Sequence, residues 1–203
     1  MNIAKIAKKL IVKKVLILNL VLLAVLFSII ALSGPSISLA ETPQILITSI
    51  GQSPDARMIN VLVSRYQIET AYEQLASPEI IKDFKMVIAV VGGSSKGLGA
   101  AGIDKNDELE RTKALIQEIK AQKVKFLVMH IGGEARRGAL SDAFLDEVVP
   151  YADHLIVVES GNKDGYFTKM SEEHKIPLEI VAKITDTGEL VKAFIEEHLN
   201  LSE

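Results

Sequence analysis

The stretch that decides the fold is Met86–Asp104, MVIAVVGGSSKGLGAAGID, in which an apolar run ends in a glycine-rich loop and a helix cap follows. Three further segments repeat the pattern: Ile45–Ala56 (ILITSIGQSPDA), Phe126–Gly138 (FLVMHIGGEARRG) and Leu155–Gly165 (LIVVESGNKDG). Apolar runs rich in Val and Ile that end at glycine are typical of strands buried on both faces. The sequence therefore predicts a parallel sheet that is covered by helices on both sides.

Segments with helical spacing of apolar residues separate these runs. One apolar helix face is expected after Ser53-Pro54, where Ser53 would be the N-cap and Pro54 the first helical residue. Another is expected after Asp104, which would be the N-cap of its helix. The apolar stripes on these two faces are Met58, Ile59, Leu62, Val63 and Tyr66, and Leu109, Thr112, Leu115, Ile116 and Ile119. The remaining expected elements are a short edge strand over 68–74, a helix from 77, a helix opened by Ser141 and stopped at Pro150, a helix over 166–174, a strand over 178–181 and a last helix from Asp186. This order predicts one three-layer, doubly wound α/β domain with a mostly parallel sheet, flavodoxin-like or Rossmann-like.

Residues 1–40 have the composition of an export leader. Five lysines (Lys5, Lys8, Lys9, Lys13 and Lys14) precede a stretch without charged residues from Val15 to Leu32. Gly34 and Pro35 then break the pattern, and Ser38-Leu39-Ala40 fits a signal peptidase site. The alternative is an uncleaved membrane anchor, since the apolar stretch is close to the length that spans a bilayer. Either interpretation predicts that residues 41–203, a single α/β domain, lie outside the cytoplasm, secreted, periplasmic or tethered through the N-terminus.

The composition of residues 41–203 excludes several classes of function. Five of the 23 Lys and Arg residues and none of the 26 Asp and Glu residues precede Glu41, so this part carries 18 basic and 26 acidic groups, a formal net charge of −8. That charge predicts no nucleic-acid partner and no membrane contact except through residues 1–40. The absence of cysteine excludes disulfides, thiol catalysis and Cys-ligated metal.

The loops that follow the strands are the candidate site, because the carboxyl ends of parallel strands meet at one edge of the sheet. The loops begin at Ser49, Gly92, His130 and Glu159 and carry hydroxyl, amide, carboxylate and cationic groups. The candidate ligand-binding residues are Ser49, Gln52, Ser53, Asp55, Gly92, Gly93, Ser94, Ser95, Lys96, His130, Gly133, Glu134, Arg136, Arg137 and Glu159.

The loop Gly93–Gly99 fits the glycine pattern of short-chain dehydrogenases, but its context does not. It follows about the third strand instead of the first, and no tyrosine is followed four residues later by lysine. A P-loop is excluded because Leu98 follows Gly97 where Lys is needed. The remaining interpretations are an oxyanion cradle of backbone N–H groups with Ser94, Ser95 and Lys96, or a tight turn that only lets helix and strand pack closely. No cofactor is expected.

The loop after the fourth strand brings two guanidinium groups to the same edge. Arg136 and Arg137 suit bidentate recognition of oxyanions, and the alternative is that they pair with nearby carboxylates. His130 is the histidine expected on this edge, whereas His154 precedes its strand. His130, Glu134, Glu159 and Asp55 have no spacing typical of a metal site, so no metal is expected.

The strings GQSPDA, GGSSKGLGAAGID and HIGGEARRGALSD together resemble an uncharacterised family of exported bacterial and archaeal proteins that is known as a domain of unknown function. The resemblance covers essentially all of residues 41–203. It implies export and an α/β domain, and it carries over no activity, ligand or catalytic residue.

Three functions fit the sequence, and binding is favoured over catalysis. The first is capture of a small polar or anionic ligand at the loop edge, serving a membrane transporter or sensor. The second is an extracytoplasmic hydrolase with His130 as general base and Ser94 or Ser95 as nucleophile, although no G-x-S-x-G elbow is present. The third is a module that binds another envelope protein.

Removal of the leader after Ala40 is expected in the producing cell, because small residues stand where signal peptidase requires them. The intact mass of the isolated protein should correspond to a chain that begins at Glu41. A full-length species that is confined to the membrane fraction would instead identify residues 1–40 as an anchor.

Overall fold

The computed structural model describes residues 9, 13–14, 16–20, 23 and 43–199. Most of the expected leader, with its cleavage site, therefore lies outside the described residues. Among the residues that the structure describes, no helix is both long and apolar enough to cross a membrane.

Six parallel strands form one sheet in the order β2-β1-β3-β4-β5-β6. The strands are β1 (Ile45–Ile50), β2 (Ala71–Tyr72), β3 (Met86–Val91), β4 (Lys125–His130), β5 (His154–Val158) and β6 (Leu178–Val181). The first five strands have the flavodoxin-like order, and β6 extends the sheet by one strand. The predicted fold class is confirmed, as a doubly wound α/β sandwich.

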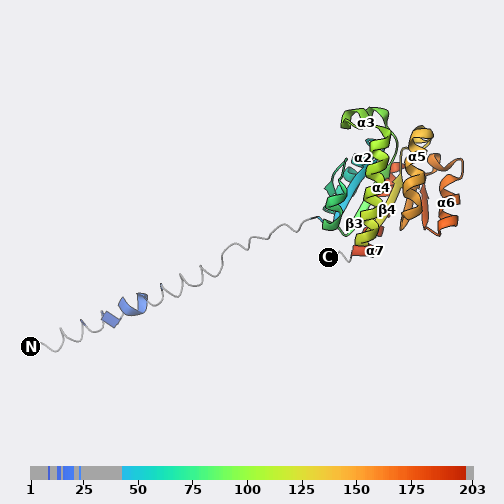
Figure 1. Ribbon diagram of the computed structural model, residues 1–203. Helices are drawn as coiled ribbons and strands as arrows, with labels where there is room; N and C mark the ends of the chain where they lie inside the picture. Colours follow the sequence, from blue (N-terminus) through green and yellow to red (C-terminus); the bar gives the residue numbers. More distant parts are fainter. Residues whose placement is uncertain (1–8, 10–12, 15, 21–22, 24–42, 200–203) are drawn as a thin grey trace, which may run out of the picture. The chain divides into compact units, whose positions relative to one another are not determined.

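The α-helices of the domain cover both faces of this sheet (Figure 1). They are α2 (Asp55–Ser64), α3 (Ser95–Ala101), α4 (Lys105–Gln122), α5 (Ala139–Val148), α6 (Tyr166–His174) and α7 (Thr187–Leu199). The 3₁₀ segments are η1 (Pro78–Asp83), η2 (Glu134–Arg136), η3 (Val149–Tyr151), η4 (Glu159–Asn162) and η5 (Ile184–Asp186). In Figure 1, α3 lies at one end of the domain and the last turn of α7 lies at the opposite end.

Alternation along each strand divides the core into two halves. In β3, Ile88 and Val90 pack with α2 and α7, whereas Val87, Ala89 and Val91 pack with η1, α4, α5 and α6. All six residues of β3 are buried, as two-sided coverage requires. Both clusters are made entirely of residues between Ile45 and Leu199, so this domain has a hydrophobic core of its own.

Five local expectations were wrong. The edge strand expected over 68–74 is only the two residues of β2. The glycine loop contains the helix α3, which the sequence did not predict because Gly97 and Gly99 have low helix propensity. Met58, expected in the buried stripe of α2, is 45% exposed. The fourth and fifth errors concern helix starts: α2 begins at Asp55 with Pro54 as N-cap, and α5 begins at Ala139, before Ser141.

A buried ion pair on α4 positions the end of β1. The Glu108 side chain is fully buried, and its Oε1 accepts hydrogen bonds from the backbone N–H of Gly51 (2.7 Å) and from Nε2 of Gln52 (3.1 Å). Arg111 donates to both carboxylate oxygens of Glu108, each at 2.7 Å. The same guanidinium donates to the carbonyl oxygens of Ser49 (2.7 Å) and Ala76 (2.9 Å). One turn of α4 thus bonds both to the β1 loop and to the segment that precedes η1.

Val90→Asp should unfold the domain, because a carboxylate inside a strand that is covered on both faces carries a large desolvation cost. A loss of more than about 4 kcal/mol in the free energy of unfolding is expected. Val61→Asp on α2, where Val61 is 48% exposed, is the matched control and should change stability by about 0.5 kcal/mol or less. A soluble Val90→Asp variant with a sharp melting transition would contradict the assignment of β3 as the buried central strand.

Arg111→Ala should cost about 3–5 kcal/mol in urea denaturation, because it leaves the Glu108 carboxylate buried without its cation. The double variant Glu108→Gln with Arg111→Met should recover part of that loss, since no charge then remains buried. Lys192→Ala, which removes the exposed pair with Glu196, serves as the control and should cost less than about 1 kcal/mol. Equal losses in Arg111→Ala and Lys192→Ala would show that burial does not decide the energy of the pair.

Candidate functional site

The carboxyl ends of β1, β3, β4 and β5 lie side by side, and the four candidate loops follow them. The register pairs Ile50 with Val91, Val90 with Met129 and His130 with Val157. All fifteen candidate residues lie on these loops, at the adjoining strand ends or in the first turn of the following helix. They differ in what their polar atoms contact.

The polar groups of the β1 loop form hydrogen bonds with other groups of the protein. Ser49 Oγ donates to the carbonyl oxygen of Ser53 (3.1 Å), and Ser53 Oγ accepts from the N–H of Asp55 (3.3 Å). Gln52 has a positive φ of 61° and forms an isolated bridge with Gly93, while its side chain donates to Glu108. Ser49, Gln52 and Ser53 are all buried. All three side chains therefore have hydrogen-bond partners within the protein.

The glycine loop after β3 also bonds to the protein's own groups. The N–H of Gly93 donates to Ser141 Oγ (2.8 Å), and the N–H of Ser94 donates to the carbonyl oxygen of Gly51 (2.8 Å). Ser94 Oγ accepts from the N–H of Gly97 and caps α3. A Cβ on Gly97 would lie 1.9 Å from the carbonyl oxygen of Gln52, so only glycine fits there. These contacts match the tight-turn interpretation, and Ser95 and Lys96 remain exposed on α3.

His130 is enclosed at the end of β4. Its ring stacks on Phe167 with 5.4 Å between centroids, and Nδ1 lies 2.9 Å from the carbonyl oxygen of Val91. Nε2 lies 3.3 Å from the carbonyl oxygen of Gly133. Burial lowers the pKa of His130 below its ordinary value, so the ring is neutral at pH 7. The shorter contact assigns the donated proton to Nδ1. Among the described residues, no serine hydroxyl bonds to this ring.

Arg137 joins the β4 loop to the β5 loop. Its Nε donates to Asp142 (2.8 Å), one terminal nitrogen donates to the carbonyl oxygen of Gly161 (2.7 Å), and both terminal nitrogens donate to Asp164 (2.9 and 2.8 Å). The guanidinium also lies 4.9 Å from the ring centroid of Tyr166. The Arg137 hydrogen bonds hold the pKa of Asp164 below its ordinary value. These contacts are the carboxylate pairing that the sequence left open.

A small pocket opens beside Arg137. It encloses about 150 Å³ and is lined by Glu134, Arg137, Ser160, Gly161, Lys163 and Asp164. Glu134 and Lys163 form an exposed ion pair at this pocket, and Glu159 is exposed nearby on η4. Gly133 adopts a φ of +60° with Ser160 Oγ beside it. No group of three metal-ligating side chains occurs in the part of the chain that the structure describes.

Asp55 and Arg136 form the remaining pair. Asp55 Oδ2 is buried and has no hydrogen-bond partner, although it lies at the edge where polar groups are otherwise satisfied. The nearest cation is Arg136 Nε at 3.9 Å, which is too long for a hydrogen bond. The carboxylate lies over Gly92 and Gly132: a Cβ on Gly132 would lie 2.8 Å from Asp55 Oδ2 and 2.1 Å from Cγ of Arg136. Arg136 is one-third exposed, so it forms the solvent side of this pair.

Sequence reasoning missed several residues that shape this edge. They are Glu108, Arg111, Ser141, Asp164, Phe167 and Gly132. For Glu108 a signal was present, since it lies four residues before Thr112 on the buried stripe of α4. The other partners come from distant segments, and no local pattern predicts them.

The fold of this chain is weakly similar to those of several solved structures. A GDSL-like lipase from Bacteroides thetaiotaomicron is 8% identical with a TM-score of 0.37, over 76% of this chain and 88% of that one. The psychrotrophic esterase EstA from Pseudoalteromonas is 10% identical with a TM-score of 0.32, over 78% of this chain and 97% of that one. The SGNH-hydrolase family esterase AlinE4 is 11% identical with a TM-score of 0.31, over 78% and 81%. These values are too low to support a statement about activity.

No curated protein matches the sequence. A family model, by contrast, matches residues 42–195, which is nearly the whole α/β domain. This chain therefore belongs to the family described as a domain of unknown function, DUF6305.

Proposed function

We propose that this domain binds a small polar ligand between Asp55 and Arg136, at the carboxyl ends of β3 and β4. The observation that supports the proposal is the buried Asp55 Oδ2, which has no hydrogen-bond donor. A buried carboxylate oxygen without a donor costs free energy, and a ligand hydroxyl or amino group would satisfy it.

Arg136 indicates a second property of the ligand, an anionic group. The guanidinium makes no hydrogen bond to the described residues, and its contact with Asp55 at 3.9 Å leaves its donors available. Arginine binds carboxylate and phosphate groups through paired donors. The ligand class is therefore a small molecule that carries an anionic group and, next to it, a hydroxyl or an amino group.

The close packing of side chains over Gly92 and Gly132 favours a small ligand. Arg136 lies across Gly132, so a ligand that reaches Asp55 must displace this side chain toward solvent. Rotation of this one partly exposed side chain would provide that access without moving the sheet.

The hydrolase alternative stays a prediction. The two ring nitrogens of His130 face the carbonyl oxygens of Val91 and Gly133, and Ser94 Oγ caps α3, so the serine and the histidine do not bond to one another in the structure. The proposed place of action is outside the cytoplasm, in service of a transporter or sensor, and the sequence of residues 1–40 supports the location.

The test is a thermal-shift panel of small carboxylates, phosphates and sulfonates, each with and without a neighbouring hydroxyl or amino group. A true ligand at one hundred times its Kd should stabilise the domain by about 2.7 kcal/mol. Asp55→Asn should abolish the preference for the hydroxyl or amino group, and Arg136→Ala should abolish the response to the anionic group.

The unliganded variants provide the control. Asp55→Asn should change the Tm little, because Oδ2 has no hydrogen bond to lose and the nearest cation, Arg136, lies 3.9 Å away. Lys169→Ala on α6 removes an exposed positive charge elsewhere and should leave the panel response unchanged. A flat response across the panel, or an equal response in Arg136→Ala and the parent domain, would rule out this site.

A further inference from the structure

Lysines from separate segments gather at the edge of the sheet where the strands begin, opposite the candidate site. Lys120 and Lys123 end α4, Lys125 is the first residue of β4, and Lys85 directly precedes β3. The N–H of Lys125 donates to the carbonyl oxygen of Lys85 (3.0 Å), which places these two residues on adjacent strands. We call Lys85, Lys120, Lys123 and Lys125 the lysine face.

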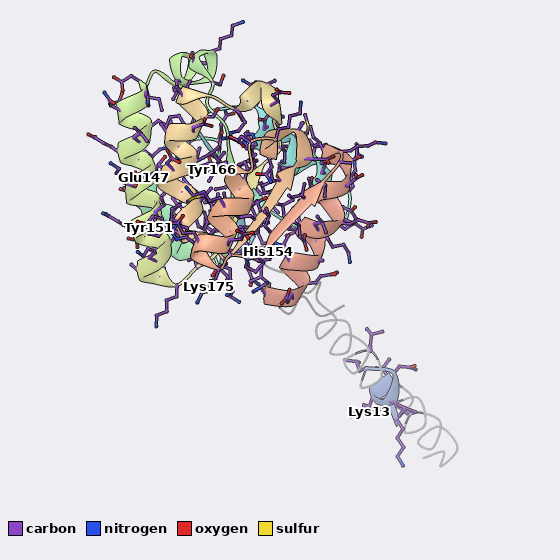
Figure 2. The ribbon with its side chains drawn as sticks, turned by 90° about the vertical axis from the view of Figure 1, so that its right-hand side faces the viewer. Lys13, Glu147, Tyr151, His154, Tyr166 and Lys175 are labelled. Atoms are coloured by element: carbon purple, nitrogen blue, oxygen red, sulfur yellow. The ribbon has the colours of Figure 1, made fainter. Side chains whose placement is uncertain are left out.

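Three of these lysines line a pocket of about 280 Å³ with Tyr151 and Asp153. The Lys120 ammonium lies 4.5 Å from the centroid of the Tyr151 ring, and that ring is 44% exposed. Figure 2 shows Tyr151 at the end of the domain that also carries His154 and Lys175, opposite the end where Figure 1 shows α3.

Three lysines and one carboxylate line this pocket. Asp153 is the acidic residue that lines the pocket; one of its oxygens accepts from the N–H of Phe126 (2.8 Å), and the other lies 3.9 Å from Lys125 Nζ. The dipole of α4 accounts for cations at its last turn, such as Lys120 and Lys123. It does not account for Lys85 and Lys125, which lie at strand starts. The excess stands out in a domain whose net charge is −8.

The chain enters the domain at the same edge. Gln44, directly before β1, accepts a hydrogen bond from the N–H of Lys85 (2.9 Å). The apolar stretch that ends at Leu32 is separated from Pro43 by ten residues, which reach at most about 36 Å. A membrane that holds this stretch during export is therefore within reach of the lysine face.

We infer that the lysine face docks the domain on the anionic headgroup surface of a bilayer. Lysines near such a surface each favour binding about fivefold, and an exposed tyrosine suits the interface between headgroups and water. In this orientation the opposite edge, with Asp55 and Arg136, is turned toward solvent. The inference is independent of the ligand proposed for that edge.

Residues 41–203 are the material for the test, since both core clusters lie within them. Co-sedimentation is measured with vesicles of phosphatidylcholine alone and of phosphatidylcholine with phosphatidylglycerol, at low and at high salt. We expect binding to the anionic vesicles only, and its loss at high salt. Lys120→Glu with Lys123→Glu should lower the partition coefficient about 25-fold or more.

The control variant is Lys169→Glu with Lys183→Glu, which changes the net charge equally at two exposed positions away from this face. It should sediment like the parent domain and melt at the parent temperature, and circular dichroism should show that Lys120→Glu with Lys123→Glu is folded at the assay temperature. Equal losses in the two double variants, or equal binding to neutral and anionic vesicles, would overturn the inference. Absence of vesicle binding together with saturable binding of an acidic protein would also overturn it and assign the face to a protein partner.

Discussion

The Glu108–Arg111 pair is the contact on which the rest of the strand-carboxyl edge depends. A fully buried carboxylate requires both a cation and hydrogen-bond donors, and here the donors are the backbone and side chain of the β1 loop. Arg111 in turn satisfies carbonyl oxygens at the end of β1 and before η1. Because the β1 loop bonds to the β3 loop through Gly51 and Ser94, the ion pair on α4 fixes the position of both loops.

The strands were predictable because their constraint is local. A segment such as Ile45–Ile50 or Met86–Val91 is buried on both faces, so each residue in it must be apolar or satisfied, and the sequence shows this directly. The short β2 and the helix α3 were not predictable on the same ground. Tertiary packing determines the length of β2 and the formation of α3. In α3, the close approach of Gln52 requires glycine at position 97, although glycine has low helix propensity.

The candidate site was predictable as a place but not as a set of contacts. Parallel topology brings the loops of Asp55, Gly92, His130 and Arg136 to one edge, and the sequence is enough to say so. Which arginine is bound internally depends on Asp164, which is 27 positions from Arg137 along the chain. The net charge shows the same limit. A formal net charge of −8 predicts no basic surface, yet the lysine face exists, because a sum over the chain does not report how the fold distributes its lysines.

The bridge between Gln52 and Gly93 has a consequence for where this fold can be open. In doubly wound sheets with this strand order, the helices after β1 and β3 run to opposite faces, and the crevice between these two strands is the usual place for a ligand. Here Gln52, with its positive φ, pairs with Gly93 across that crevice, and the Gln52 side-chain amide donates to the buried Glu108 carboxylate. The loops after β1 and β3 are therefore tied to each other at the point where sheets of this order usually bind a ligand, and a ligand that entered there would have to separate Gln52 from Gly93.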